Sequence, residues 1–301
     1  MKKLILIVVT FVGCLQLNAQ QDPHFAQFFD NMLFVNPAYA GSRDVLNVTG
    51  IHREQWVGFA GRPSSTTLSL HSPLSYRSIG LGLTVVDDKV GPFKQNLFYG
   101  DFSYSIKFKN KSKLAFGLKG GLNLINIGTG NLNVNDNTDQ AFSQSVSNLV
   151  NPNFGFGVYY HSSKFFIGAS TPKLLEKSYD GTATNLEKRH YFFNVGGVIP
   201  VNRILKLRPI VQTKLTVGAP VSIDASCAAI VREKLYLGAI YRLDAAFGAY
   251  VQYQIAPSFR FGFATEFGTQ EIRQYNSGTF EVMASYELVF RKDGVRSPRF
   301  F

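Results

Sequence analysis

Residue types that commonly perform chemistry are few and scattered in this chain. It has five histidines and two cysteines among 301 residues. A hydrolase needs a nucleophile, a general base and an orienting group that converge, yet no histidine here lies in a tight motif with Ser or Cys. The histidines are His24, His52, His71, His161 and His190. We predict no catalytic residue, no cofactor-binding residue and no enzyme activity.

Metal-ligating residues show no better clustering. Cys227 is the single cysteine of the mature chain, and no close pair of histidines or carboxylates has ligand spacing. Asp87-Asp88 and the run Asn133-Val134-Asn135-Asp136-Asn137 offer oxygen ligands of the kind that calcium prefers. The run lacks the calcium-loop pattern with its final Glu, so we interpret it as a polar outer loop. We predict no metal site.

The N-terminus has the features of an export signal. Lys2 and Lys3 give a positive start, Leu4 to Val12 form a short apolar core, and Leu17-Asn18-Ala19 places a small residue before a cleavage point. A helix that crosses a bilayer takes about 20 apolar residues, more than this core provides. We therefore predict a signal peptide over residues 1–19.

Cleavage after Ala19 leaves a mature chain that begins at Gln20 or Gln21. No proline-rich or serine-rich linker divides residues 20–301, so we expect a single domain with an N-terminal segment over residues 20–42. In an alternative interpretation Cys14, which follows Gly13, carries a lipid.

The composition is poor in charge and rich in aromatic residues. Charged residues make up 17% of the chain, whereas soluble domains average about 25%. Aromatic residues make up 14%, and the net charge of +11 falls to +9 when Lys2 and Lys3 leave with the signal. The basic residues are dispersed, and an exported chain seldom meets nucleic acid. We expect no nucleic-acid partner, but contact with outer-membrane lipid or with acidic protein surfaces.

Long tracts of the chain alternate between apolar and polar residues. In residues 258–267 the odd positions hold Phe259, Phe261 and Phe263, and the even positions hold Arg260 and Glu266. The mature chain has no apolar run of about eighteen residues, so helices that span a membrane are excluded. Alternation over about ten residues is typical of strands in a membrane barrel. The fold class we predict is all-β, a transmembrane antiparallel β-barrel.

Counting these tracts gives about fourteen strands, an even number like that of single-chain bacterial outer-membrane barrels. The predicted strands cover residues 44–55, 64–72, 78–87, 95–108, 112–127, 152–161, 164–170, 189–199, 204–215, 220–231, 234–242, 245–255, 258–267 and 279–290. An even number places both termini on one side, which we expect to be the periplasm.

The connectors agree with this arrangement, because barrels of this class have short periplasmic turns and longer outer loops. Asn110-Lys111 and Ala256-Pro257 are short and fall on the expected periplasmic side, whereas Gly128 to Asn151 and Thr171 to Lys188 are long and fall outside. A soluble two-sheet protein also alternates, but it exposes fewer Phe. Within the ninth predicted strand, Pro209 indicates a bulge or a break.

The segment before the first strand is too hydrophobic for a free tail. Asp22-Pro23 suits the start of a helix, Phe25 and Met32 recur at helical spacing with Phe28 or Phe29 between them, and Asn36-Pro37 ends it. We expect a short helical or irregular segment at the periplasmic end of the barrel. Two roles are open for it, covering the opening or binding a partner.

Several motifs resemble those of a known family. They are QDPHFAQF and VNPAYAGS within Gln21 to Ser42, HREQWVGFAGRPSSTTLSLHSPL from His52 to Leu74, GLGLTVVDDKVGPF from Gly80 to Phe93, and the terminal RSPRFF. Together they resemble the PorP/SprF-type outer-membrane proteins of the type IX secretion system, across the whole chain.

The resemblance implies a noncatalytic outer-membrane barrel that helps to secrete or display large surface proteins, including gliding adhesins. Partners implied are an adhesin, recognised through its C-terminal secretion domain, other components of the machine, and a periplasmic peptidoglycan-binding protein. A diffusion porin or solute channel is the alternative function, because charged residues fall at predicted lumen positions.

Candidate partner-binding residues come from the same motifs. They are Phe25, Phe28, Phe29, Asn36, Pro37, Tyr39, Arg53, Trp56 and Arg62. Arg53 and Arg62 suit an acidic partner or the N-terminal segment, but a solvated or lumen-paired arginine explains them equally well. Trp56 also suits a membrane interface.

The predicted register turns charges of both signs into the lumen. They are Lys119, Lys206, Arg208, Lys214, Arg242, Arg260, Asp101, Asp224, Glu266, Glu281 and Glu287. A barrel of this width is not filled by its own side chains. These charges therefore need water, one another, or an inserted segment.

Overall fold

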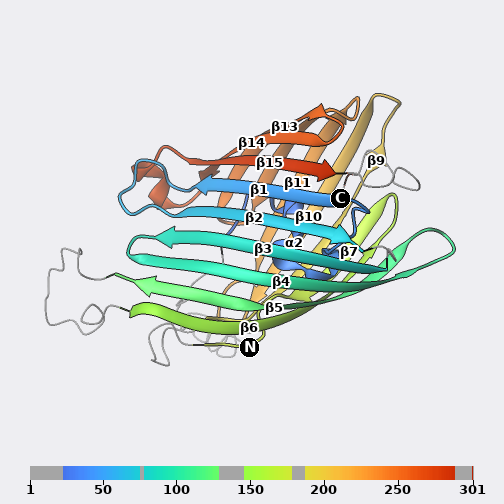
Figure 1. Ribbon diagram of the computed structural model, residues 1–301. Coiled ribbons are helices and arrows are strands. Elements are labelled where there is room, and N and C mark those ends of the chain that lie inside the picture. The colour runs from blue at the N-terminus through green and yellow to red at the C-terminus, as the bar shows by residue number, and fades with distance from the viewer. Residues whose placement is uncertain (1–22, 75–77, 129–145, 178–186, 289–299, 301) are drawn as a thin grey trace, which may run out of the picture.

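A computed structural model describes residues 23–74, 78–128, 146–177, 187–288 and 300. Its strands form one antiparallel sheet that closes, because β1 pairs with β15 and β10 pairs with β11. β9 has only two residues and continues β8 along β10, so the wall is a closed barrel of fourteen strands. The predicted fold class is confirmed (Figure 1).

The strands follow one another around the wall in chain order. Their bounds are β1 (Leu46–Glu54), β2 (Ser64–Pro73), β3 (Ile79–Val90), β4 (Phe93–Lys107), β5 (Lys113–Ile127), β6 (Val146–His161), β7 (Phe165–Thr171), β8 (His190–Gly197), β9 (Ile199–Pro200), β10 (Leu205–Thr216), β11 (Ser222–Val231), β12 (Leu235–Arg242), β13 (Ala246–Ala256), β14 (Phe259–Gly268) and β15 (Thr279–Leu288). The turns 108–112, 162–164, 232–234 and 257–258 lie at one rim, here called the short-turn rim, and the short turns 91–92 and 243–245 lie at the opposite rim. The connectors 55–63 and 269–278 lie at the other, the long-connector rim.

One strand differs clearly from its predicted range. β6 begins at Val146, whereas we expected a connector as far as residue 151. The pairing of β5 with β6 shifts between Ile125 and Ile127, and Asn148 on the bulged side has a φ of 55°. A bulge interrupts the alternation of faces, which hid the start of this strand. Residues 129–145, with the polar run Asn133 to Asn137, lie outside the described residues.

The expectation that Pro209 breaks its own strand is wrong. β10 pairs with β11 without interruption, and Pro209 lies opposite Cys227. The interruption falls on the neighbour, where β8 ends at Gly197 and β9 resumes at Ile199. Because proline has no N–H to donate, Pro209 removes one hydrogen bond from the ladder on this side of β10, whereas on the β7 side the Val198 N–H still donates to the carbonyl of Lys164 at 2.7 Å.

Side chains alternate between the two surfaces of the wall as predicted. Leu118 and Phe154 point outward and are 63% and 58% exposed, whereas Lys119 and Glu281 point inward and are 3% and 1% exposed. Large apolar groups on the outside and charges inside are an arrangement suited to lipid. Among the described residues, no helix is long and apolar enough to cross a bilayer.

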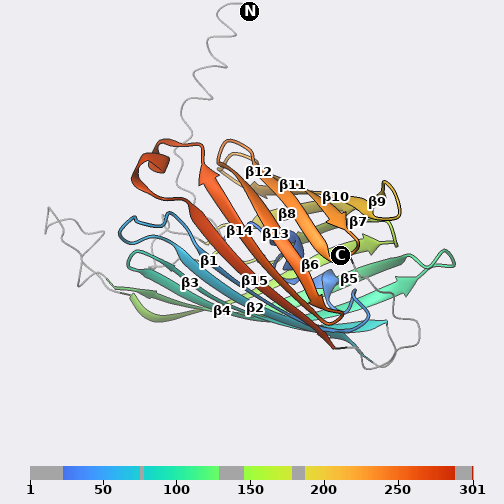
Figure 2. The same cartoon turned by 90° about the horizontal axis from the view of Figure 1, so that it is seen from above.

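The N-terminal segment lies inside the barrel rather than across its opening (Figures 1 and 2). It holds no continuous helix from Pro23, but three short elements, η1 (Phe28–Asp30), α2 (Met32–Val35) and η2 (Pro37–Tyr39). The break at Asn36 is confirmed, because its side chain accepts the Ala38 N–H at 3.0 Å and so caps η2. The predicted signal peptide, with Cys14, and Asp22 lie outside the described residues.

Because of the N-terminal segment, the described chain begins at the opposite rim from the start of the sheet. Leu46 pairs with Leu288, so the sheet starts and finishes at the short-turn rim, as an even strand number requires. The segment runs back through the lumen from there. His24 consequently lies beside Asp224, at the end of β11 that adjoins the long-connector rim.

Candidate functional site

Residues 23–45 form a plug that fills the middle of the barrel. Ala26 and Ala38 have no exposed surface. The wall provides space through glycines, because a Cβ on Gly117 would lie 2.1 Å from the Ala38 nitrogen and a Cβ on Gly80 would lie 2.1 Å from the Ala40 carbonyl oxygen. Any larger residue at either position would collide with the backbone of the plug.

Aromatic side chains of the plug pack against aromatic side chains of the wall. The ring of Phe29 lies 5.0 Å from that of Tyr250, and the ring of Tyr39 lies 5.4 Å from Tyr159 and 5.1 Å from His71. Such tilted and edge-on pairs add about 0.5–1.5 kcal/mol each beyond the burial of their area. The aromatic residues of the N-terminal motifs therefore anchor the plug.

Buried carboxylates hold the first half of the plug. Glu281 on β15 accepts the backbone N–H groups of Ala26 at 2.7 Å and of Gln27 at 2.8 Å. Asp30 of the plug pairs with Arg260 on β14 at 2.6 Å. Hydrogen bonds to charged groups are stronger than neutral ones, so these contacts fix the plug in one position.

The second half of the plug is held in the same way. Arg43 pairs with Glu287 at 2.7 Å near the short-turn rim. Lys119 on β5 donates to the Leu33 carbonyl at 3.1 Å and pairs with Asp101 on β4 at 3.0 Å. Wall charges from both sides of the barrel thus bind the plug.

A charge network lies between the plug and the long-connector rim. Arg53 pairs with Glu266 and, at 3.4 Å, with Glu281. Arg242 pairs with Asp224 at 2.7 Å and with Glu266 at 3.6 Å. We expected the lumen charges to be compensated by water, by one another, or by an inserted segment. The structure shows two of these, because the charges pair with one another and with the plug.

His24 joins the start of the plug to this network. Its ring contacts the ammonium of Lys214, and its Nδ1 lies 3.8 Å from Asp224. Burial, with the neighbouring charge of Lys214, lowers the pKa of His24 from 6.5 to about 4. The imidazole is therefore neutral at physiological pH.

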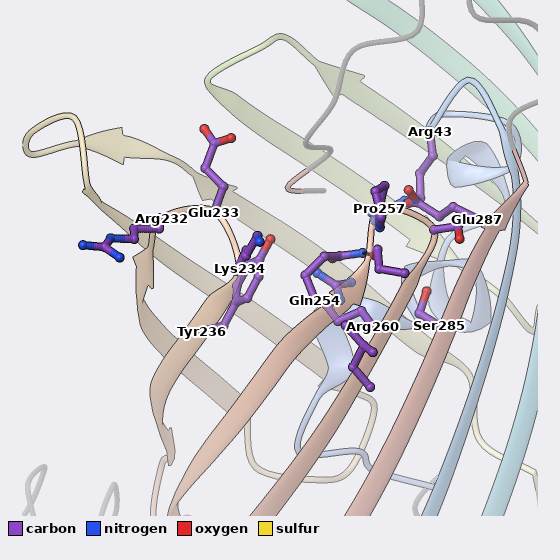
Figure 3. Close-up of a pocket in the computed structure, with 13 residues that line it drawn as sticks. Arg43, Arg232, Glu233, Lys234, Tyr236, Gln254, Pro257, Arg260, Ser285 and Glu287 are labelled. Atoms are coloured by element: carbon purple, nitrogen blue, oxygen red, sulfur yellow. Dashed lines mark hydrogen bonds and ion pairs between the residues drawn. The ribbon is translucent and has the colours of Figure 1, made fainter.

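In the part of the chain that the structure describes, a cavity remains at either end of the barrel. A vestibule of about 560 Å³ opens at the long-connector rim. Its walls include His24, Arg53, Gln55, Trp56, Gln95 and Glu266. A short-turn pocket of about 300 Å³ lies at the opposite rim. Figure 3 shows Arg43 and Glu287 on one side of that pocket and Arg232, Glu233 and Lys234 on the other.

The structure brings most of the candidate partner-binding residues together, but inside the barrel. Phe25, Phe28, Phe29, Asn36, Pro37 and Tyr39 are buried in the plug. Arg53 is buried and paired in the lumen, and Trp56 is half-buried in the vestibule wall. Arg62 lies apart and pairs with Glu54 at 2.7 Å on the exposed connector.

Sequence reasoning missed the polar residues that position the plug. Gln27, Asp30 and Arg43 bind wall residues more than 200 positions away along the chain. The sequence pointed to these residues only indirectly. The predicted lumen charges needed partners, and an inserted segment was one of the possible sources. Asp87 and Asp88 lie on β3 rather than in a loop, and Asp88 accepts hydrogen bonds from Ser65 and Gln95.

The model of the PorP/SprF family, described as "Type IX secretion system membrane protein PorP/SprF", matches residues 17–286. The chain belongs to this family. No curated protein matches the chain. The family and the barrel together support a role in type IX secretion at the outer membrane.

Solved outer-membrane barrels share the fold of this PorP/SprF protein at low identity. The TodX monoaromatic hydrocarbon channel deltaS2 mutant is 12% identical, with a TM-score of 0.52 over 87% of this chain and 94% of that one. The toluene transporter TbuX of Ralstonia pickettii is 11% identical, with a TM-score of 0.50 over 85% and 92%. Omp33 of Acinetobacter baumannii is 9% identical, with a TM-score of 0.46 over 81% and 98%. These likenesses concern the fold alone.

Proposed function

We propose that this protein is a noncatalytic outer-membrane component of type IX secretion that docks a large secreted surface protein. The docked part is the C-terminal secretion domain of an adhesin, and the protein links it to other components of the secretion and gliding machinery. The filled lumen is the observation that carries this proposal. A barrel whose centre is packed with its own chain is suited to presenting surfaces at its rims.

The vestibule is the docking surface that we favour. Trp56 offers a half-buried aromatic face, and aromatic anchors dominate the binding energy of protein interfaces. Arg62, which is exposed on the same connector, extends this surface outward. In this proposal the long-connector rim faces outward and the short-turn rim faces the periplasm, where a peptidoglycan-binding partner has access to it.

A deletion strain complemented with single variants tests this role. We expect deletion to abolish surface display of at least one large secreted protein, and Trp56→Ala to restore display much less well than the wild type. Phe59→Ala is the matched control, because it removes an aromatic residue from the same connector outside the vestibule. Normal display of every surface protein in the deletion strain would refute the proposal.

A diffusion porin or solute channel is the second candidate function. The polar and charged lining of the vestibule favours it. Passage through the described lumen, however, requires the plug to move. This candidate therefore predicts conductance in a plug-deleted protein, whereas docking at the rims needs no conductance.

A further inference from the structure

Exposed cations line a large part of the short-turn rim. Four successive turns of the wall carry at least one each, namely the turns from β4 to β5, from β6 to β7, from β9 to β10 and from β11 to β12. These cations, here called the basic arc, are Lys109, Lys111, Lys164, Arg203, Arg232 and Lys234. Within the described part of the chain, none of the six side chains has an ion pair or a hydrogen bond.

The acidic residues described at the same rim are already neutralised. Each of them forms an ion pair, and the pairs are Asp44 with Lys113, Glu233 with Lys206, and Glu287 with Arg43. The long-connector rim differs, because the exposed carboxylates of Asp244 and Glu271 lie there among its cations. The basic arc therefore keeps its positive charge, which suits an anionic partner.

Lipid-facing aromatic side chains lie directly beside the basic arc. Phe108 is 44% exposed next to Lys109, and Phe165 is 48% exposed next to Lys164. The ring of Tyr160 lies 6.4 Å from that of Phe108 and 5.6 Å from that of Phe165, so the three rings form one cluster on the outer surface. Aromatic residues collect where hydrocarbon meets headgroups, and the long stems of Lys and Arg let their charges reach that level. This neighbourhood favours a lipid over a protein as the anionic partner.

Two cations of the arc occupy backbone positions that glycine would adopt more easily. Lys111 has a φ of 66° and Arg232 has a φ of 49°. A residue with a Cβ is disfavoured in this left-handed region, whereas glycine is not. The geometry of the turns therefore does not explain the charged side chains, which are left free to bind.

We propose that the basic arc binds the phosphate groups of anionic phospholipid headgroups in the adjoining leaflet. Each of the four turns offers one or two cations to a headgroup, and the acyl chains lie against outward apolar residues such as Phe165 and Ile204. The bound lipids hold this side of the wall at a fixed depth in the bilayer. The proposal requires no protein partner, so its test is separate from that of the docking role.

Native mass spectrometry of the folded protein tests the proposal in nanodiscs that contain equal amounts of phosphatidylglycerol and phosphatidylcholine. The lipids that stay bound as the nanodisc dissociates are counted. We expect them to be enriched in phosphatidylglycerol by about fivefold, the change that one cation near an anionic surface produces. The enrichment falls as the ionic strength rises from about 0.05 M to about 0.5 M, because salt screens exposed charges.

Two variants with the same loss of charge complete the test, and heat-modifiable migration establishes that each has folded. In the arc variant the enrichment falls close to the bulk proportion, and its substitutions are Lys109→Gln, Lys164→Gln, Arg203→Gln and Arg232→Gln. The control variant keeps the enrichment, because its substitutions lie at the long-connector rim and are Lys89→Gln, Lys94→Gln, Lys188→Gln and Arg273→Gln. Equal enrichment in the two variants overturns the proposal. Lipid retained in bulk proportion by the unaltered protein also overturns it, and would leave an acidic protein as the partner of the arc.

Discussion

Glu281 shows how a single residue connects wall, plug and charge network. Its carboxylate accepts two backbone N–H groups of the plug and lies 3.4 Å from Arg53. A buried charge is tolerated only when hydrogen bonds and an opposite charge compensate its desolvation. Here the plug supplies the hydrogen bonds and Arg53 of the wall supplies the opposite charge. The carboxylate of Glu281 needs both.

Glu281→Gln is expected to weaken the seating of the plug by about 2 kcal/mol, because the backbone N–H groups of Ala26 and Gln27 lose a charged acceptor. Hydrogen exchange of Ala26 and Gln27 measures this as a marked loss of protection. Glu54→Gln is the control, since Glu54 pairs with Arg62 on an exposed connector, where an ion pair contributes less than about 1 kcal/mol. Equal loss of protection in both variants would contradict the assigned role of Glu281.

His24 gives the plug a pH dependence whose sign follows from its lowered pKa. The seated imidazole has a pKa of about 4, whereas a released imidazole has the ordinary value of 6.5. Between these values the released form takes up a proton and the seated form does not, so acidification favours release, by at most about 3 kcal/mol.

Planar-bilayer recordings check this pH dependence. We expect opening events to become more frequent as the solution is acidified from about pH 7.5 to about pH 5. His24→Gln abolishes the difference, because glutamine does not titrate. His52→Gln, which changes an exposed histidine outside the lumen, retains it. An unchanged pH response in the His24 variant would show that another group is responsible.

At the scale of elements, the plug packs against the wall strands through close contact between their backbones. η2 lies against β5 at Gly117, where a Cβ would come within 2.1 Å of the Ala38 nitrogen. Gly117→Ala is expected to displace η2 and to expose residues 36–40 to hydrogen exchange. Gly100→Ala on the adjacent strand β4 is the control, because the nearest atom to its added Cβ lies at 3.9 Å. Similar exchange in the two variants would mean that the lumen accommodates the methyl group.

The strands were predictable because their signal is local. Alternation at positions such as Phe261 and Phe263 shows which residues of a strand face lipid, and it does so without knowledge of the adjacent strands. Alternation failed at Asn148, where a bulge changes the period. The plug was predictable only as a docked hydrophobic segment. Its position depends on pairs such as Asp30 with Arg260, which are 230 residues apart, and no local pattern contains that information.

The whole molecule is a closed barrel with its own N-terminal segment in the middle and a cavity at each end. This arrangement predicts little steady conductance for the intact chain. Deletion of residues 21–40 removes most of the plug and is expected to produce stable open channels in planar bilayers, provided that the variant migrates as a folded barrel. Absence of conductance after deletion would exclude the porin function and would indicate that other parts of the chain close the lumen.

The docking role at the outer membrane is tested most directly by photo-cross-linking in living cells. A photoreactive residue replaces Trp56 in the vestibule, and the same residue at Phe98, on the lipid-facing side of β4, serves as the control. We predict that position 56 captures a large secreted surface protein together with type IX components, and that position 98 does not. Capture of neither from position 56, in cells that secrete normally, would contradict the proposed function.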